Sequence, residues 1–157
     1  MPISNFIFDI RETKFVLKEW IDMDKLLSCP AYKNYYGVDD IEPIIDTAFK
    51  ITRDVIAPMS KESDRIGAQF IDGKVITPDS FKKAFAVINE AGLGAQNADR
   101  EAEGRLPYTI ARSYEEMFLG VNLGFATFSG IPAGAISVIQ EHGSEFLKQK
   151  FLPKMIT

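Results

Sequence analysis

The sequence has very little of the residue types that build metal and thiol chemistry. It contains one cysteine, Cys29, and one histidine, His142. A single cysteine excludes a disulfide within the chain, which is typical of a protein in a reducing compartment. A single histidine needs carboxylate or thiolate partners at suitable spacing to hold a metal, and His142-Gly143 is typical of a helix end. Cys29 precedes a proline and has no histidine near it in the sequence. Structural roles are favoured for both, and no metal site is predicted.

Basic clusters and long uninterrupted apolar runs are also absent. The net charge is −4 and the pI is near 5.1, whereas binding to nucleic acid usually requires clustered Lys and Arg. The longest apolar stretch, Val121 to Ile139, contains four Gly or Pro residues and is interpreted as a buried core segment rather than a membrane span. The early acids Asp9 and Glu12 argue against a targeting peptide. We therefore predict a cytoplasmic protein with no nucleic-acid or membrane partner.

No motif for phosphate, nucleotide or covalent chemistry occurs in the sequence, which lacks GxGxxG, P-loop, GxSxG and CxxC patterns. Three pairs of acids stand beside no recognisable nucleophile: Asp39-Asp40, Glu101 with Glu103, and Glu115-Glu116. Solvation or helix pairing explains them better than acid–base catalysis. The residues alone predict no self-contained active site, and no catalytic residue is assigned.

The sequence does have helical periodicity with clear start and stop signals. Asp9 and Glu12 have capping-box spacing, and Cys29-Pro30 ends the first helix. The apolar face between them comprises Val16, Trp20, Met23 and Leu27. Asp39 and Glu42 repeat the capping signal before a second helix, which Pro58 is expected to end or kink. Its apolar face comprises Ile41, Ile44, Ile45, Ala48, Thr52, Val55 and Ile56.

A small hairpin and further helices follow. The segment Phe70 to Thr77 carries Asp72-Gly73 between two apolar runs, which predicts a hairpin. Thr77-Pro78 is expected to cap and open a third helix, closed at Gly92 or Gly94. Its apolar stripe comprises Phe81, Ala84, Phe85, Ile88 and Ala91.

Three more helices complete the prediction. Pro107 begins a fourth, with Ile110, Tyr114, Met117, Phe118 and Val121 pointing inward. A turn bracketed by Gly120 and Gly124 leads to a fifth, largely apolar helix that ends at His142-Gly143. Ser144 caps a last short helix, ended by Pro153. The expected fold is all-α: an antiparallel bundle of about six helices with one small β-hairpin insert.

One face of the fifth helix is unusually rich in small residues. Thr127, Gly130, Ile131 and Gly134 recur at i, i+3, i+4 and i+7, so they share one side of the helix. Small side chains there indicate either that another helix approaches closely or that the space belongs to a ligand. The residues by themselves favour close packing.

The order of segments along the chain resembles the N-terminal helical domain of acyl-CoA dehydrogenases. The resemblance runs from Ile41 to Thr157 through VIAPM, AGLGA, EEMFLGVNLGFATF and AISVIQEHGSEFLKQKFLPKM. Residues 1–40 resemble the N-terminal extension of longer bacterial members, similar to methylthiopropionyl-CoA and broad-range fatty acyl-CoA dehydrogenases. The polar loop ADREAEGRLP departs from the family, because it lacks the usual Gly-Gly pair. The predicted organisation is an extension, 1–40, followed by a helical domain, 41–157.

The resemblance implies a function and a site. Members of the family oxidise the α,β bond of an acyl-CoA thioester with bound FAD. The helix that matches the small-residue face forms part of the acyl pocket wall in the family, so Thr127, Gly130 and Gly134 are implied substrate-binding residues. Ile131 joins them by helical spacing. With the resemblance included, ligand space and close packing explain the small residues equally well. If the space belongs to the ligand, the two glycines leave room for a long or bulky acyl group.

The resemblance also implies partners. In the family the flavin lies mainly between a middle β-domain and a C-terminal helical domain, and the catalytic glutamate belongs to the latter. None of these parts has a counterpart here, so we expect these residues alone to bind no FAD tightly and to be inactive. The parent enzyme is expected to be a homo-oligomer that uses electron-transfer flavoprotein or a similar acceptor. A cloned domain, a truncated gene product and one part of a split enzyme all fit. The alternative is a stand-alone helical interaction or scaffold module derived from this fold.

Overall fold

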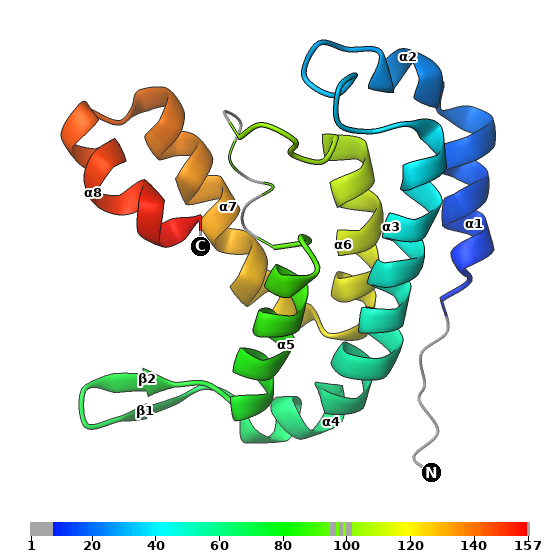
Figure 1. The fold of residues 1–157 in the computed structure, drawn as a ribbon. Helices are drawn as coiled ribbons and strands as arrows, with labels where there is room; N and C mark the ends of the chain where they lie inside the picture. Colours follow the sequence, from blue (N-terminus) through cyan, green and yellow to red (C-terminus); the bar gives the residue numbers. More distant parts are fainter. Residues whose placement is uncertain (1–7, 95–96, 98, 100–101, 157) are drawn as a thin grey trace.

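The computed structural model of the protein describes residues 8–94, 97, 99 and 102–156. Its helices and strands, shown in Figure 1, are α1 (Ile10–Phe15), α2 (Met23–Leu27), α3 (Val38–Ile51), α4 (Ala57–Ile66), β1 (Gln69–Ile71), β2 (Lys74–Ile76), α5 (Asp79–Glu90), α6 (Tyr108–Val121), α7 (Leu123–His142) and α8 (Glu145–Met155). Two π-helical turns, Val16–Trp20 and Thr52–Ile56, continue α1 and join α3 to α4. In the described part this makes seven continuous helices and one hairpin, which confirms the all-α prediction.

The first helix differs from the predicted amphipathic face at Trp20. Asp9 caps it as expected, accepting a hydrogen bond from the Arg11 N–H at 3.0 Å. The π-helical turn adds a residue to the helical repeat, and Leu17 becomes the buried residue while Trp20 is 77% exposed. A change of period shifts every later side chain around the axis. The prediction that Val16 and Trp20 point inward is wrong, since Val16 is exposed as well, whereas Met23 and Leu27 are buried as predicted.

The long central helix begins and continues differently from its prediction. Asp39 is not the cap: the helix begins at Val38, and the Asp40 carboxylate accepts the Gly37 N–H at 2.8 Å. Pro58 does not end it either, because a π-helical turn precedes the proline and the helix continues to Ile66. π-Bulges and proline are common causes of such irregularities in helices. The predicted inward face itself is confirmed at Ile41, Ile45, Ala48, Thr52 and Ile56, all buried.

The predicted hairpin projects from the helical body (Figure 1). Its strands pair antiparallel with Phe70 opposite Val75, and Asp72 and Gly73 have positive φ angles of 49° and 75°. Positive φ at both positions is the geometry of a two-residue type I′ turn. Thr77 does not cap α5: Pro78 takes the cap position with no side-chain hydrogen bond. Gly92, with φ of 74°, ends that helix as predicted.

One hydrophobic core unites α3 and α6 with the elements around them. Its fully buried side chains include Ile45, Ile56, Ile110, Tyr114, Met117 and Phe125. Leu17, Met23 and Leu27, from the segment predicted as an N-terminal extension, belong to the same cluster. The first helices therefore pack on the helical body, and the division at residue 40 stays a prediction.

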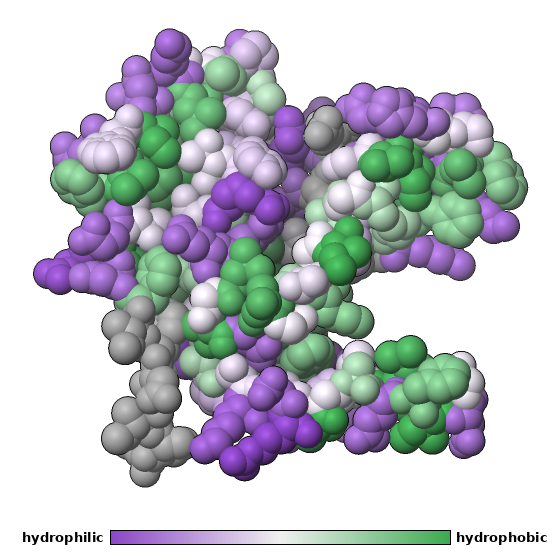
Figure 2. Space-filling model, turned by 180° about the vertical axis from the view of Figure 1, so that it is seen from behind, coloured by the Kyte–Doolittle hydropathy of each residue, from purple (hydrophilic) through white to green (hydrophobic). Residues whose placement is uncertain are grey.

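The α7–α8 arm is less buried than the core helices α3 and α6, and α8 has no buried residue. Asn122 begins α7 by accepting the Phe125 N–H at 3.0 Å, and Ser144 begins α8, which continues through Pro153 to Met155 rather than ending there. By length and composition alone α7 could span a membrane, with 24% of its most apolar window buried. The core helix of a soluble protein meets the same test. Figure 2 shows apolar surface on this arm and on the hairpin.

Candidate functional site

A cavity of about 520 Å³ lies between α5, α6, α7 and the segment that joins α5 to α6. One wall is α7, which starts at the Asn122 turn beside the end of α6. The opposite wall is α6, whose lining residues Tyr108, Arg112, Glu115 and Leu119 recur at helical spacing. The two helices are joined directly at one end, so their facing sides form the cavity walls.

All four residues predicted for substrate binding line this cavity. Thr127, Gly130, Ile131 and Gly134 lie on the α7 wall, as their spacing required. Each is exposed, and Ile131 is 68% exposed. The cavity therefore opens to solvent along the α7 face in this chain. Their binding of an acyl group stays a prediction.

The space around the two glycines bears on the two alternatives, close packing and ligand space, that the sequence left open. A Cβ atom built at Gly130 or at Gly134 meets no other atom within 4 Å. If another helix of the described chain approached closely at these positions, that atom would be in contact with it. Within the described residues the small side chains border open space, so close packing inside this chain does not explain them.

The α6 wall carries an ion pair that the sequence did not single out as such. The Arg112 guanidinium contacts the Glu115 carboxylate at 2.5 Å and lies 4.8 Å from the centre of the Tyr108 ring. Burial raises the pKa of Glu115, while the neighbouring Arg112 opposes that shift. The preference for solvation or helix pairing over acid–base catalysis stays a prediction, and the partner that the structure gives Glu115 is Arg112 of the same helix. The i, i+4, i+7 spacing of Tyr108, Arg112 and Glu115 is the sequence signal from which this cluster could have been predicted.

The inner end of the cavity is held by polar contacts around Asn97. Its amide donates to the Gly92 carbonyl at 2.7 Å and to the Tyr114 hydroxyl at 3.3 Å, while its oxygen accepts the Leu106 N–H at 3.2 Å. The Tyr114 hydroxyl donates onward to the Leu93 carbonyl, and burial strongly raises its pKa. Asn97 therefore ties both ends of the α5–α6 connection to α6. Glu101, one of the acids considered above, lies outside the described residues.

The described residues offer few groups suited to a metal ion or to the pyrophosphate of FAD. No cluster of potential metal ligands occurs among them. FAD needs donors for its pyrophosphate, commonly a helix N-terminus or free cations. The cationic groups on this cavity are Arg105 and Arg112, and Arg112 is already paired with Glu115. The remaining lining residues are largely apolar. We derive no flavin step from these residues.

Comparison with known proteins gives the family context of this helical pocket domain. No protein-family model matches the chain. It is 48% and 44% identical to two butyryl-CoA dehydrogenases of Syntrophomonas wolfei, and 24% identical to 3-methylmercaptopropionyl-CoA dehydrogenase of Ruegeria pomeroyi. Each alignment covers 99% of this chain but about a quarter of the relative's length.

These relatives confirm the resemblance seen in the sequence: the chain is homologous to the N-terminal quarter of acyl-CoA dehydrogenases. The match includes nearly all of residues 1–40, which agrees with the predicted resemblance of this segment to the extension of longer members. The extension is thus shared with these relatives.

Proposed function

We propose that this chain is the N-terminal helical domain of an FAD-dependent acyl-CoA dehydrogenase, in which α7 walls the acyl pocket. The observation that carries the proposal is the placement of Thr127, Gly130, Ile131 and Gly134 along one open cavity. Open space at both glycines supports a ligand role for this face. Homology to enzymes named for acyl-CoA substrates supports the choice of ligand.

In the parent enzyme the FAD would accept the hydride that leaves the acyl Cβ when an α-proton is removed. The residues of this chain would contribute binding instead: a largely apolar cavity that receives the acyl chain and excludes water from it. An electron-transfer flavoprotein or similar acceptor, a homo-oligomeric assembly and a cytoplasmic location belong to the same proposal.

The open space at the two glycines bears on the size of the acyl group that the pocket would accept. Two relatives are named for butyryl-CoA, but an open face at Gly130 and Gly134 leaves room for acyl groups longer than butyryl. We propose that the parent enzyme accepts both. A side chain placed at Gly130 would then obstruct a long acyl chain more than a short one.

The test is kcat/KM for butyryl-CoA and for a long-chain acyl-CoA in the full-length protein carrying Gly130→Leu. Discrimination against the long substrate should rise by about 10- to 200-fold, the scale of a methylene-sized clash in an apolar pocket. Gly120→Leu is the matched control, because its Cβ also meets no atom within 4 Å and it lies outside the cavity. Equal losses on both substrates would reject the assignment of the acyl pocket to α7.

A further inference from the structure

A second cavity, of about 610 Å³, lies on the other side of the molecule, between the first helices and the start of α3. Its floor is apolar and includes the buried side chains of Leu17, Met23 and Ile41. Trp20 lines it and remains 77% exposed, because the π-helical turn Val16–Trp20 moves this side chain off the core. An exposed tryptophan beside an apolar hollow is typical of a protein contact. We call this site the Trp20 pocket.

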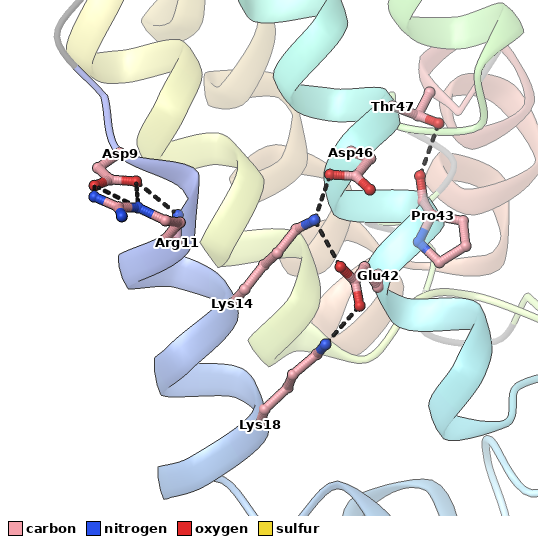
Figure 3. A network of polar contacts seen from close by, with 8 residues as sticks. All are labelled: Asp9, Arg11, Lys14, Lys18, Glu42, Pro43, Asp46 and Thr47. Carbon is pink, nitrogen blue, oxygen red and sulfur yellow. Dashed lines mark hydrogen bonds and ion pairs between the residues drawn. The ribbon is translucent and has the colours of Figure 1, made fainter.

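The charges around the Trp20 pocket indicate the sign of its occupant. Its lysines, Lys14 and Lys18, are both bound to Glu42, at 2.8 and 2.5 Å (Figure 3). Lys14 also contacts Asp46 at 2.7 Å. The acidic lining residues outnumber the two lysines and are Glu19, Asp22, Asp24, Asp39 and Glu42. The pocket therefore presents excess negative charge around an apolar floor.

The same chain carries a surface of opposite character on α8. Lys150 lies between two aromatic rings, with its Nζ 5.0 Å from the centre of the Phe146 ring and 5.6 Å from that of Phe151. Lys148 and Lys154 add charge, whereas the acid of this helix is Glu145, which lies 3.7 Å from Lys148. Phe146 is 65% exposed, and no α8 residue is buried.

We propose that the Trp20 pocket receives the Lys150 surface of α8 from a second copy of this chain. Carboxylates around the pocket would pair with the ammonium groups, while the α8 aromatic rings would cover Trp20 and the apolar floor. A contact within one copy is excluded, because α8 and the first helices lie at opposite sides of the molecule (Figure 1). Each copy carries both halves on opposite sides, so copies would join head to tail, and the same contact would repeat from one copy to the next.

The single tryptophan makes the contact directly observable. Trp20 fluorescence and sedimentation are measured on the chain over a range of concentrations. The expected result is a shift of emission to shorter wavelength in step with the growth of a larger species, and reversal of both by high salt. A monomer at every concentration, or association without any change in Trp20 emission, would overturn the proposal.

Charge-reversed variants test the pairing itself. Glu19→Lys with Asp39→Lys changes the pocket, and Lys148→Glu with Lys150→Glu changes α8. Each double variant should self-associate at least about tenfold more weakly, and an equimolar mixture of the two should recover the affinity, since both cross-contacts are again complementary. Glu116→Lys, on an exposed position of α6 outside both cavities, is the control. Failure of the mixture to recover would also refute the pairing.

Discussion

Asn122 and Ser63 are joined by a buried hydrogen bond, in which the Asn122 amide donates to the Ser63 hydroxyl at 3.0 Å. The other end of the Asn122 side chain caps α7 by accepting the Phe125 N–H. Ser60, one turn before Ser63, donates to the Val121 carbonyl at 2.9 Å. The turn that aims α7 is therefore fastened to α4, and these contacts set the direction of the cavity wall.

Replacing Asn122 should destabilise the fold markedly. Asn122→Ala removes the helix cap and takes one hydrogen-bond partner from the buried Ser63 hydroxyl. Together these losses should lower the free energy of unfolding by about 2–3 kcal/mol. Chemical denaturation measures the change. Asn34→Ala, at an exposed position before α3, is the control and should stay within about 0.5 kcal/mol. A loss for Asn122→Ala no larger than that of the control would contradict the anchoring role.

Two glycines of the same arm should respond in opposite directions to alanine. Gly134→Ala places a Cβ in open space within α7 and should stabilise the isolated chain by up to about 1 kcal/mol through helix propensity. Gly143→Ala drives a Cβ against the Ile139 carbonyl oxygen at the end of that helix. This clash should cost about 1–3 kcal/mol. Thermal unfolding of the pair measures both, and destabilisation by Gly134→Ala would show that a neighbour occupies that space.

The Lys14–Glu42–Lys18 network should make stability depend on acid pH. Hydrogen bonds from Lys14 and then Lys18 lower the pKa of Glu42 from 4.5 to about 2. A folded-state pKa below the unfolded value stabilises the fold above about pH 4.5, and this contribution disappears as the pH falls toward 2. The melting temperature of Glu42→Gln should lie below that of the wild type near pH 6 and meet it near pH 2.

The matched control for that experiment is Glu62→Gln, at an exposed position of α4. The difference in melting temperature between pH 6 and pH 2 should be the same in this variant as in the wild type. Because the network is only partly buried, salt should shrink the effect of Glu42→Gln. A Glu42→Gln difference that persists undiminished at pH 2 would mean that packing, not charge, causes it.

The exposed apolar face of α7 should bind hydrophobic dyes. Ile131 and Val138, two turns apart, are 68% and 61% exposed, and contiguous apolar surface of this kind is uncommon on monomers. Ile131→Lys with Val138→Lys should lower dye fluorescence strongly and reduce aggregation of the isolated chain. Ile66→Lys, at an exposed position at the end of α4, should change neither. Dye binding that survives the double substitution would place the sticky surface elsewhere.

Local sequence signals predicted most of the fold correctly. Helix periodicity, the Asp9 and Ser144 caps and the Asp72-Gly73 turn all depend on residues close together in the chain, so they are visible without a structure. The shared face of Thr127, Gly130, Ile131 and Gly134 follows from helical spacing in the same way. The predicted helix ends at Pro58 and Pro153 were wrong. A proline in the sequence does not reveal whether a π-helical turn or later packing lets the helix continue past it.

Only the tertiary structure decided which faces are covered. Trp20 had the right spacing for the core, yet the π-helical turn buries Leu17 instead. Which side chain is buried depends on the helices that pack against this segment, and these come from distant parts of the chain. Spacing likewise could not tell whether Gly130 and Gly134 meet a helix or open space. That depends on where α6 lies relative to α7, which the buried Asn122 turn sets. The sequence by itself determined the helices and the composition of their faces, whereas packing determined which face became a cavity wall.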